Sequence, residues 1–248
     1  MDGLINVLAA LTAGVLPAAF WLFVWHRHDA EHPEPAHRVA YAFIAGMLCV
    51  PVAIVFQTKV GTDWIGTTSY AELASRGLIF AVPAIAIWAF IEEALKFVAC
   101  WIAALRSRDA DEPMDPVMYL ITTGLGFAAM ENALYFISPI SSLAGTELLH
   151  QGINRFIGST LVHVACSAIV GMAWSLTMFT FVRARLTFRL LGLVCATALH
   201  LAFNVLMIMD EHFRIAAFAL TWTACVSLVV LFEKIKQVHL NVIINEEA

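Results

Sequence analysis

The sequence predicts an all-α fold, a polytopic transmembrane helix bundle of about seven spans. Of its 248 residues, 61% are hydrophobic and only 13% are charged, and the mean hydropathy is +0.82. These values lie outside the range of soluble globular domains. Apolar runs of about 20 residues, the length that crosses a ~30 Å hydrocarbon core as a helix, lie between short charged connections. The longest polar connections, 58–76 and 139–155, hold fewer than 20 residues each. We therefore expect a single membrane-embedded domain over residues 1–248.

The apolar runs define the expected spans in order. The first run has no basic segment before it and exceeds the length of a signal-peptide core, so we interpret it as a retained span. The first, second and seventh runs carry no ionisable group near their centres, whereas the third to sixth runs do. The cysteines all fall inside runs, where we expect them to act as small apolar residues. The seven expected spans are 4–25, 38–57, 77–105, 117–138, 156–182, 186–208 and 215–232.

The distribution of Lys and Arg predicts an outer N-terminus and a cytoplasmic C-terminus. The side that is richer in these residues normally faces the cytoplasm. The odd-numbered connections and the C-terminal tail hold Arg27, Arg38, Arg106, Arg108, Arg183, Arg185, Arg189, Lys234 and Lys236, whereas the other side holds only Lys59, Arg76, Arg155 and Arg214. The net charge of −5 is spread over loops and tail, so it indicates no nucleic-acid partner.

Four consecutive spans place ionisable or amide side chains at membrane depth, where a charge is costly and therefore marks a functional site by default. They are Glu92, Glu93 and Lys96 in the third span, Glu131 and Asn132 in the fourth, His163 and Ser167 in the fifth, and His200 and Asn204 in the sixth. Glycines near this set, Gly124 and Gly126, are interpreted as packing positions.

The spacing and depth of these groups predict that they converge. Residues four apart share a helical face, which applies to three pairs: Glu92 with Lys96, His163 with Ser167, and His200 with Asn204. At ~1.5 Å of rise per residue, Glu92, Glu131 and His200 lie roughly 20 Å from their cytoplasmic ends, and His163 lies nearer the depth of Asn204. We therefore expect one cavity, at or somewhat outside the bilayer midplane, within a catalytic core of about residues 77–210.

Carboxylates, imidazoles and an amide in one cavity suit the hydrolysis of an amide bond. The reaction needs an activated water, a proton donor for the leaving amine and donors for the oxyanion. In a metal version, His163, His200 and Glu131 form a two-histidine, one-carboxylate site, and Glu92 or Glu93 takes the proton of the bound water. The zinc-helix signature H-E-x-x-H is absent from the sequence. A serine nucleophile at Ser167 is less favoured, because its nearest imidazole lies along the same helix.

Other readings of the same residues stay open. Glu92 and Lys96 could form an ion pair that merely neutralises itself, and single histidines could be structural. A proton-coupled transporter or ion pathway could use a Glu and His relay, although the internal repeat typical of transporters is not visible. The chain could also be a membrane scaffold that has lost its chemistry.

The motifs resemble those of the PrsW-type intramembrane proteases, bacterial enzymes that cut membrane-anchored anti-sigma factors. They are "EEALK" in the third span, "GFAAMEN" in the fourth, His163 in the fifth and "HLAFN" in the sixth. A more distant similarity is to the CAAX prenyl endopeptidases and the related abortive-infection proteins, with the signature E-E-x-x-x-R, F-x-x-x-H and H-x-x-x-N. Here Lys96 stands three positions after the second glutamate, and Phe127-x-x-x-Glu131 has a carboxylate in place of the histidine. His200-x-x-x-Asn204 fits, and the carboxylate favours the PrsW type.

The resemblance implies an intramembrane endopeptidase of the bacterial cell (inner) membrane that acts in the lipid bilayer on a single-span, anti-sigma-factor-like protein. It implies that Glu92 and Glu93 include the base, assisted by Lys96, and that Glu131 and His163 bind or polarise the water or a metal. His200 and Asn204 would complete the metal site or the oxyanion hole. Imidazoles facing carboxylates are good zinc ligands, so we expect a divalent metal, with zinc favoured over a metal-free glutamate mechanism.

Overall fold

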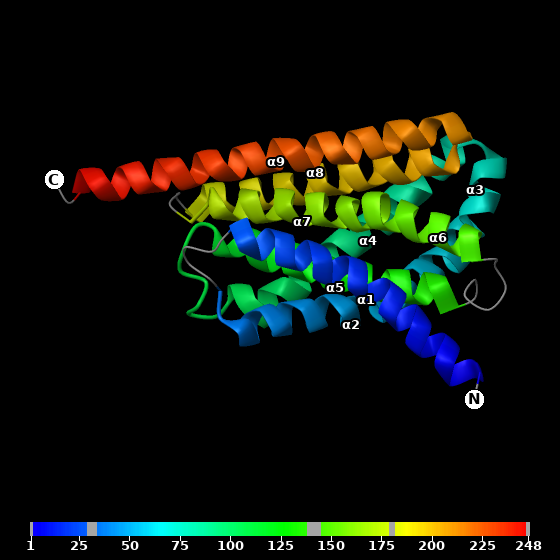
Figure 1. Cartoon of the computed structure of the whole chain (residues 1–248). Coiled ribbons are helices and arrows are strands. Elements are labelled where there is room, and N and C mark those ends of the chain that lie inside the picture. The colour runs from blue at the N-terminus through cyan, green and yellow to red at the C-terminus, as the bar shows by residue number, and fades with distance from the viewer. Residues whose placement is uncertain (1, 29–33, 138–144, 179–181, 247–248) are drawn as a thin grey trace.

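The computed structural model describes residues 2–28, 34–137, 145–178 and 182–246, and the regular structure within these ranges is helical (Figure 1). Three of the segments are short π-helices, which are marked η. The elements are α1 (Asp2–His28), α2 (Ala36–Val60), η1 (Gly61–Ile65), α3 (Tyr70–Arg76), α4 (Leu78–Cys100), η2 (Trp101–Leu105), α5 (Asp115–Ile137), α6 (Gly145–Asn154), η4 (Arg155–Ser159), α7 (Thr160–Ser175), α8 (Val182–Ile208) and α9 (Glu211–Glu246).

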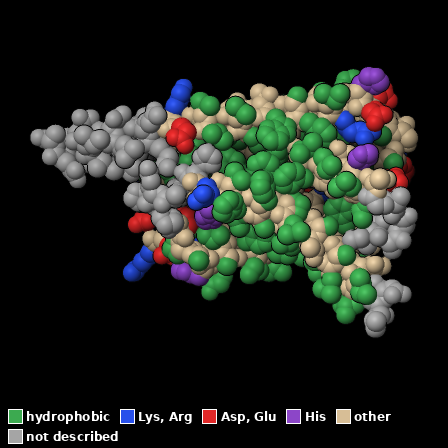
Figure 2. Space-filling view, viewed as in Figure 1, with side chains coloured by type: hydrophobic (Ala, Val, Ile, Leu, Met, Phe, Trp, Pro, Cys, Tyr) green, Lys and Arg blue, Asp and Glu red, His purple; other side chains and the backbone are tan. Residues whose placement is uncertain are grey.

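The prediction of seven spans is confirmed, because seven described helices are long and apolar enough to cross a membrane. In Figure 2 hydrophobic side chains cover the middle of the visible face, and charged side chains gather toward the two ends of the bundle. The two termini lie at opposite ends of the bundle in Figure 1, as an odd number of spans requires. Which end faces the cytoplasm stays a prediction.

The boundaries of some spans differ from the expected ones. The fifth was expected at 156–182, but a continuous helical run begins at Gly145 and α7 ends at Ser175. Residues 145–155 look like a polar loop because they include Glu147, His150 and Gln151. These side chains lie on α6, a helix that also exposes Leu149 and Ile153. The other expected polar connection, 58–76, similarly contains the end of α2, η1 and the short helix α3.

Helix α5 lies at the centre of the bundle and packs against α1, α2 and α7. A Cβ atom added at Gly126 would lie 2.0 Å from the carbonyl oxygen of Phe43 on α2, and one added at Gly46 would lie 2.0 Å from that of Thr123 on α5. The backbones of α2 and α5 therefore touch directly, as small residues allow in membrane helices. Gly124 is likewise closed in by α7. The prediction that Gly124 and Gly126 serve packing is confirmed.

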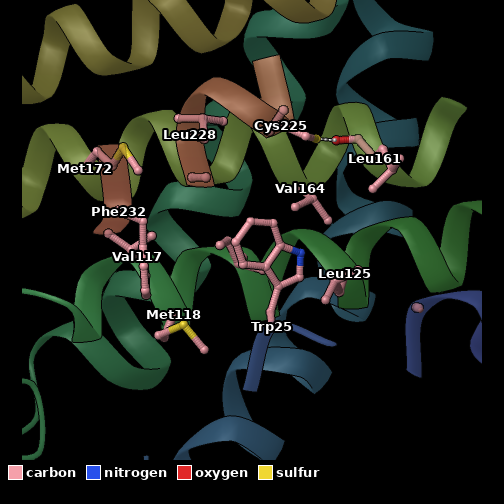
Figure 3. Close-up of a cluster of buried hydrophobic side chains, with 14 of the residues drawn as sticks. Trp25, Val117, Met118, Leu125, Leu161, Val164, Met172, Cys225, Leu228 and Phe232 are labelled. Atoms are coloured by element: carbon pink, nitrogen blue, oxygen red, sulfur yellow. Dashed lines mark hydrogen bonds between the residues drawn. The ribbon is translucent and has the colours of Figure 1, made fainter. Parts of the chain in front are cut away.

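An apolar cluster joins α1, α5, α7 and α9 (Figure 3). Trp25 of α1 lies among side chains of the other three helices, and the Cys225 Sγ atom is 3.8 Å from the carbonyl oxygen of Leu161. The thiol thus packs as a small apolar group, and the cysteines of the chain are free. Leu161 and Val164 of α7 pack into this cluster. His163 lies on another face of α7, beside Lys96 of α4.

Candidate active site

A cavity of about 430 Å³ lies among α4, α5, α7 and α8, toward the end of the bundle that carries α3 and α6 (Figure 1). Five of the residues that the sequence predicts for the site line this cavity: Glu92, Glu131, His163, His200 and Asn204. Its remaining wall is formed by Tyr70, Tyr135, Gln151, Asn154, Arg155, Ser159, Val162, Phe203, Met207, Ile208 and Arg214. Most of the lining residues are polar or ionisable, and only Val162, Phe203, Met207 and Ile208 are aliphatic or phenyl side chains.

Glu93 and Lys96 lie behind the two histidines and hold them. Lys96 Nζ donates a hydrogen bond to Glu93 Oε1 at 2.6 Å, and His200 Nδ1 donates to the same oxygen at 2.7 Å. Lys96 Nζ also lies 3.2 Å from His163 Nδ1. The side chains of Glu93 and Lys96 are each only 1% exposed. This pair therefore neutralises its own charge inside the protein and fixes the orientation of both imidazole rings.

The structure decides which glutamate of α4 pairs with Lys96. The four-residue spacing puts Lys96 on the face of Glu92, and a pair between them was one open alternative, but the salt bridge joins Lys96 to Glu93, three residues away. Both spacings place side chains within reach on a helix. Contacts from the two histidines, of His200 with Glu93 and of His163 with Lys96, favour the pairing with Glu93. Glu92 is thus left without a lysine and lies at the cavity.

Glu131 is held at the mouth of the cavity by an arginine. Arg155 Nη2 donates to Glu131 Oε2 at 2.7 Å and to Ser159 Oγ at 3.1 Å, and Arg155 Nε donates to the side-chain oxygen of Asn132. The guanidinium also lies over the ring of Tyr135, 4.5 Å from its centroid. Glu131 Oε2 in turn lies 3.0 Å from His163 Nε2. A carboxylate with an arginine partner stays charged and oriented.

The predicted convergence is therefore found in the structure. Contacts run without a gap from Glu131 through His163, Lys96, Glu93 and His200, and the two imidazole centroids are 5.1 Å apart. Groups donated by four different helices are close enough to act on one substrate. Ser167 does not join them, because its hydroxyl lies against Gly124 of α5.

The donor set fits a divalent metal. One ligand atom each of Glu92, His163 and His200 lie within 4.8 Å of one another, and all three residues are buried. Two imidazoles and one carboxylate are a common ligand set for a catalytic zinc ion, with a position left for water. Glu92 Oε2 is buried and has no hydrogen-bond partner within the described residues, and such an atom calls for a ligand. The hydrogen bond from His200 Nδ1 to Glu93 is the contact that usually orients a metal-binding histidine.

This set differs in one member from the predicted one. The sequence assigns Glu131 to the metal beside His163 and His200, whereas the donors that lie closest together include Glu92 in its place. The role of Glu131 as a ligand stays a prediction. A second group of possible donors, Glu93, Cys166 and His200, shares His200, but Glu93 Oε1 already accepts hydrogen bonds from Lys96 and His200.

Two residues of the site were missed by reasoning from the sequence. Gln57 of α2 donates to Glu92, yet it stands at the end of an apolar run and outside the expected core. Arg155 was counted as a loop charge, although it belongs to η4 within the fifth membrane-crossing helix. The position of Arg155, one helical turn before Ser159 and two turns before His163, could have indicated that it shares their helical face.

Comparisons with known proteins agree with the geometry. Residues 34–233 match the family model described as "PrsW family intramembrane metalloprotease". A protein named "Protease PrsW" from Bacillus subtilis (strain 168) is 25% identical over 206 residues, which cover 81% of this chain and 84% of that protein. Proteins of the same name from Geobacillus kaustophilus (strain HTA426) and Shouchella clausii (strain KSM-K16) are 25% and 24% identical, over 72% and 85% of this chain and 71% and 87% of their own lengths. No solved structure matches the chain.

Proposed function

Because the chain belongs to the PrsW family of intramembrane metalloproteases, we propose that its cavity hydrolyses a peptide bond of a single-span membrane protein. The chain is a multi-pass bacterial membrane protein and an intramembrane protease. The observation that carries the proposed site is the convergence of two imidazoles and two carboxylates, from four membrane helices, around one cavity, with Glu93 bonded to one of the imidazoles. Such a site can activate a water and accept and return its proton.

The proposed cofactor is a divalent metal ion, with zinc favoured, held by His163, His200 and Glu92. When bound, a zinc ion supplies a water that loses its proton near neutral pH and a Lewis acid for the scissile carbonyl. Glu93 orients His200 through its Nδ1 proton. Glu131, the other carboxylate on the cavity wall, is held by Arg155 through Oε2 and would help to polarise the water. Asn204 is placed to donate its amide proton to the oxyanion.

A metal-free version of the mechanism differs at Lys96 and His163. A charged Lys96 can only donate, so His163 Nδ1 then accepts from it and His163 Nε2 carries a proton toward Glu131. In that state His163 acts as a hydrogen-bond donor, and Glu92 Oε2 is the free base. In the metal version, His163, His200 and Glu92 would hold the ion, and the ion pair of Lys96 with Glu93 would keep both imidazoles in place.

The substrate that we propose is a single-span protein of the anti-sigma-factor type. The motif resemblance supports this class. The cavity lies toward the end of the bundle that the charge distribution predicts to be outside, so we place the scissile bond near or within the outer half of the bilayer. A peptide bond must leave its helix to enter, because the backbone groups of an intact helix are already paired.

The test is cleavage of a single-span reporter by the purified protein in detergent and in liposomes. We expect Glu92→Gln and His200→Ala each to abolish cleavage while thermal unfolding stays cooperative, and Glu233→Gln on the exposed part of α9 to leave it unchanged. Elemental analysis should find about one metal ion per chain, and a chelator should remove both metal and activity. Full cleavage by metal-free protein would select the metal-free version, and proton flux without cleavage would support the transport alternative.

A further inference from the structure

Helix α2 contributes one side chain to the buried polar cluster, although its sequence offers no ionisable group there. Gln57 Nε2 donates a hydrogen bond to Glu92 Oε1 at 2.7 Å and lies 3.4 Å from the carbonyl oxygen of Trp88. Gln57 stands outside the core of residues 77–210 that the motifs define. The amide nitrogen is the atom that faces Glu92, since a carboxylate oxygen without a proton can only accept.

The two oxygens of Glu92 have different surroundings. Oε1 accepts from Gln57, whereas Oε2 is buried without a hydrogen bond to any described residue and lies 3.7 Å from His200 Nε2. A buried carboxylate oxygen without a hydrogen bond costs free energy. Such an atom is therefore expected where it binds a ligand or takes part in the reaction. The terminal torsion of a glutamate is broad and nearly two-fold. Without a partner on Oε1, the carboxylate would be free to turn or swing away from His200.

We infer that Gln57 is a positioning residue: it holds Glu92 so that Oε2 faces His200 and the cavity. The inference rests on the proposed function, because it needs Glu92 to bind the metal or activate the water. Gln57 acts through Glu92 and does not line the cavity. Losing an outer partner of a metal ligand typically lowers metal affinity or activity by about 10–100-fold, and the same range is expected here.

The experiment compares Gln57→Leu with Gln57→His and with Thr58→Val in the full-length protein. Leucine fills a similar volume but cannot donate, whereas the Nε2 atom of histidine is the same number of bonds from the backbone and can donate. Thr58 is exposed and adjacent on α2, so Thr58→Val controls for the loss of a polar group on this helix. Each protein is assayed for kcat and KM on the reporter, for zinc affinity by titration of the metal-free protein, and for thermal unfolding.

We expect Gln57→Leu to lower kcat by about 10–100-fold with little change in KM, and to weaken zinc binding. Gln57→His should recover most of the kcat and of the zinc affinity. Thr58→Val should match the parent protein in both quantities. Unchanged kcat in Gln57→Leu, a loss explained by unfolding alone, or no recovery with histidine would each overturn the inference. If Glu92→Gln still cleaves, the proposed function itself fails. If Glu92→Gln is inactive and Gln57→Leu is fully active, only the role of Gln57 is refuted. If the parent protein binds no zinc, the kcat values of Gln57→Leu and Gln57→His still decide whether Gln57 positions Glu92.

Discussion

Replacing Lys96 by methionine should destabilise the protein strongly. Lys96 and Glu93 are 2.6 Å apart with 1% of each side chain exposed, so the substitution leaves a buried carboxylate with His200 as its remaining partner. Removing one member of such a pair costs about 3–5 kcal/mol. Because each 1.4 kcal/mol is a factor of about ten, the unfolding equilibrium should shift by two to three orders of magnitude or more. Methionine fills a similar volume, so the loss of packing adds little.

The assay is equilibrium unfolding in mixed detergent micelles, followed by helix content. Lys59→Met is the matched control, because Lys59 pairs with Asp63 at 2.7 Å on the surface and exposed pairs contribute little. The double variant Lys96→Met with Glu93→Leu should lose less than the two single variants together, by about 1–3 kcal/mol, since no charge is left unpaired. A loss in Lys96→Met no larger than in Lys59→Met would refute the assignment of a buried, charged pair.

Three further outcomes are expected. Gly126→Ala should cost about 1–3 kcal/mol in the same unfolding assay, because its Cβ would meet backbone at 2.0 Å, whereas Gly152→Ala, with open space around it, should not destabilise. The hydrogen bond from Arg38 holds the pKa of Asp109 below its ordinary value of 3.8. The carboxylate therefore stabilises the fold above that value, and the stability advantage over Asp109→Asn should vanish as the pH falls through the lowered pKa. Arg155→Lys should reduce cleavage by about 10-fold or more, because an ammonium cannot reproduce the planar, multiple contacts; activity equal to the parent enzyme would contradict this role.

The sequence was sufficient to predict the number of spans and the gathering of the polar groups, although not every span boundary. Ionisable side chains at membrane depth are costly when they face lipid, so they turn to the interior of the bundle. This rule predicts that Glu92, Glu131, His163 and His200 face one another. Helical spacing could not decide whether Lys96 pairs with Glu92 or Glu93, because both lie within one turn. That choice depends on the imidazoles donated by α7 and α8, which a single helix does not specify.

The residues that were missed have a common physical cause. Gln57 is neutral and stands where α2 was expected to end, so neither charge nor periodicity singled it out. Arg155 belongs to a π-helical turn, which inserts an extra residue into the helix and breaks the apolar period at that point. The polar residues of α6 also made residues 145–155 look like a loop in the sequence. Sequence patterns of one element thus identify which side chains are costly, whereas the supporting contacts between elements need coordinates.

The enclosure of α5 also limits how this enzyme can change during evolution or in the laboratory. Every residue of that helix from Asp115 to Ala129 is buried, with close neighbours on α1, α2 and α7, so a saturation mutagenesis scan should find very few tolerated replacements over this part of it. The rim of the cavity is different: Tyr70, Gln151 and Arg214 come from α3, α6 and the start of α9, segments at one end of the bundle (Figure 1). New substrate preferences are therefore most accessible through these rim segments, which carry none of the proposed catalytic groups of α4, α5, α7 and α8.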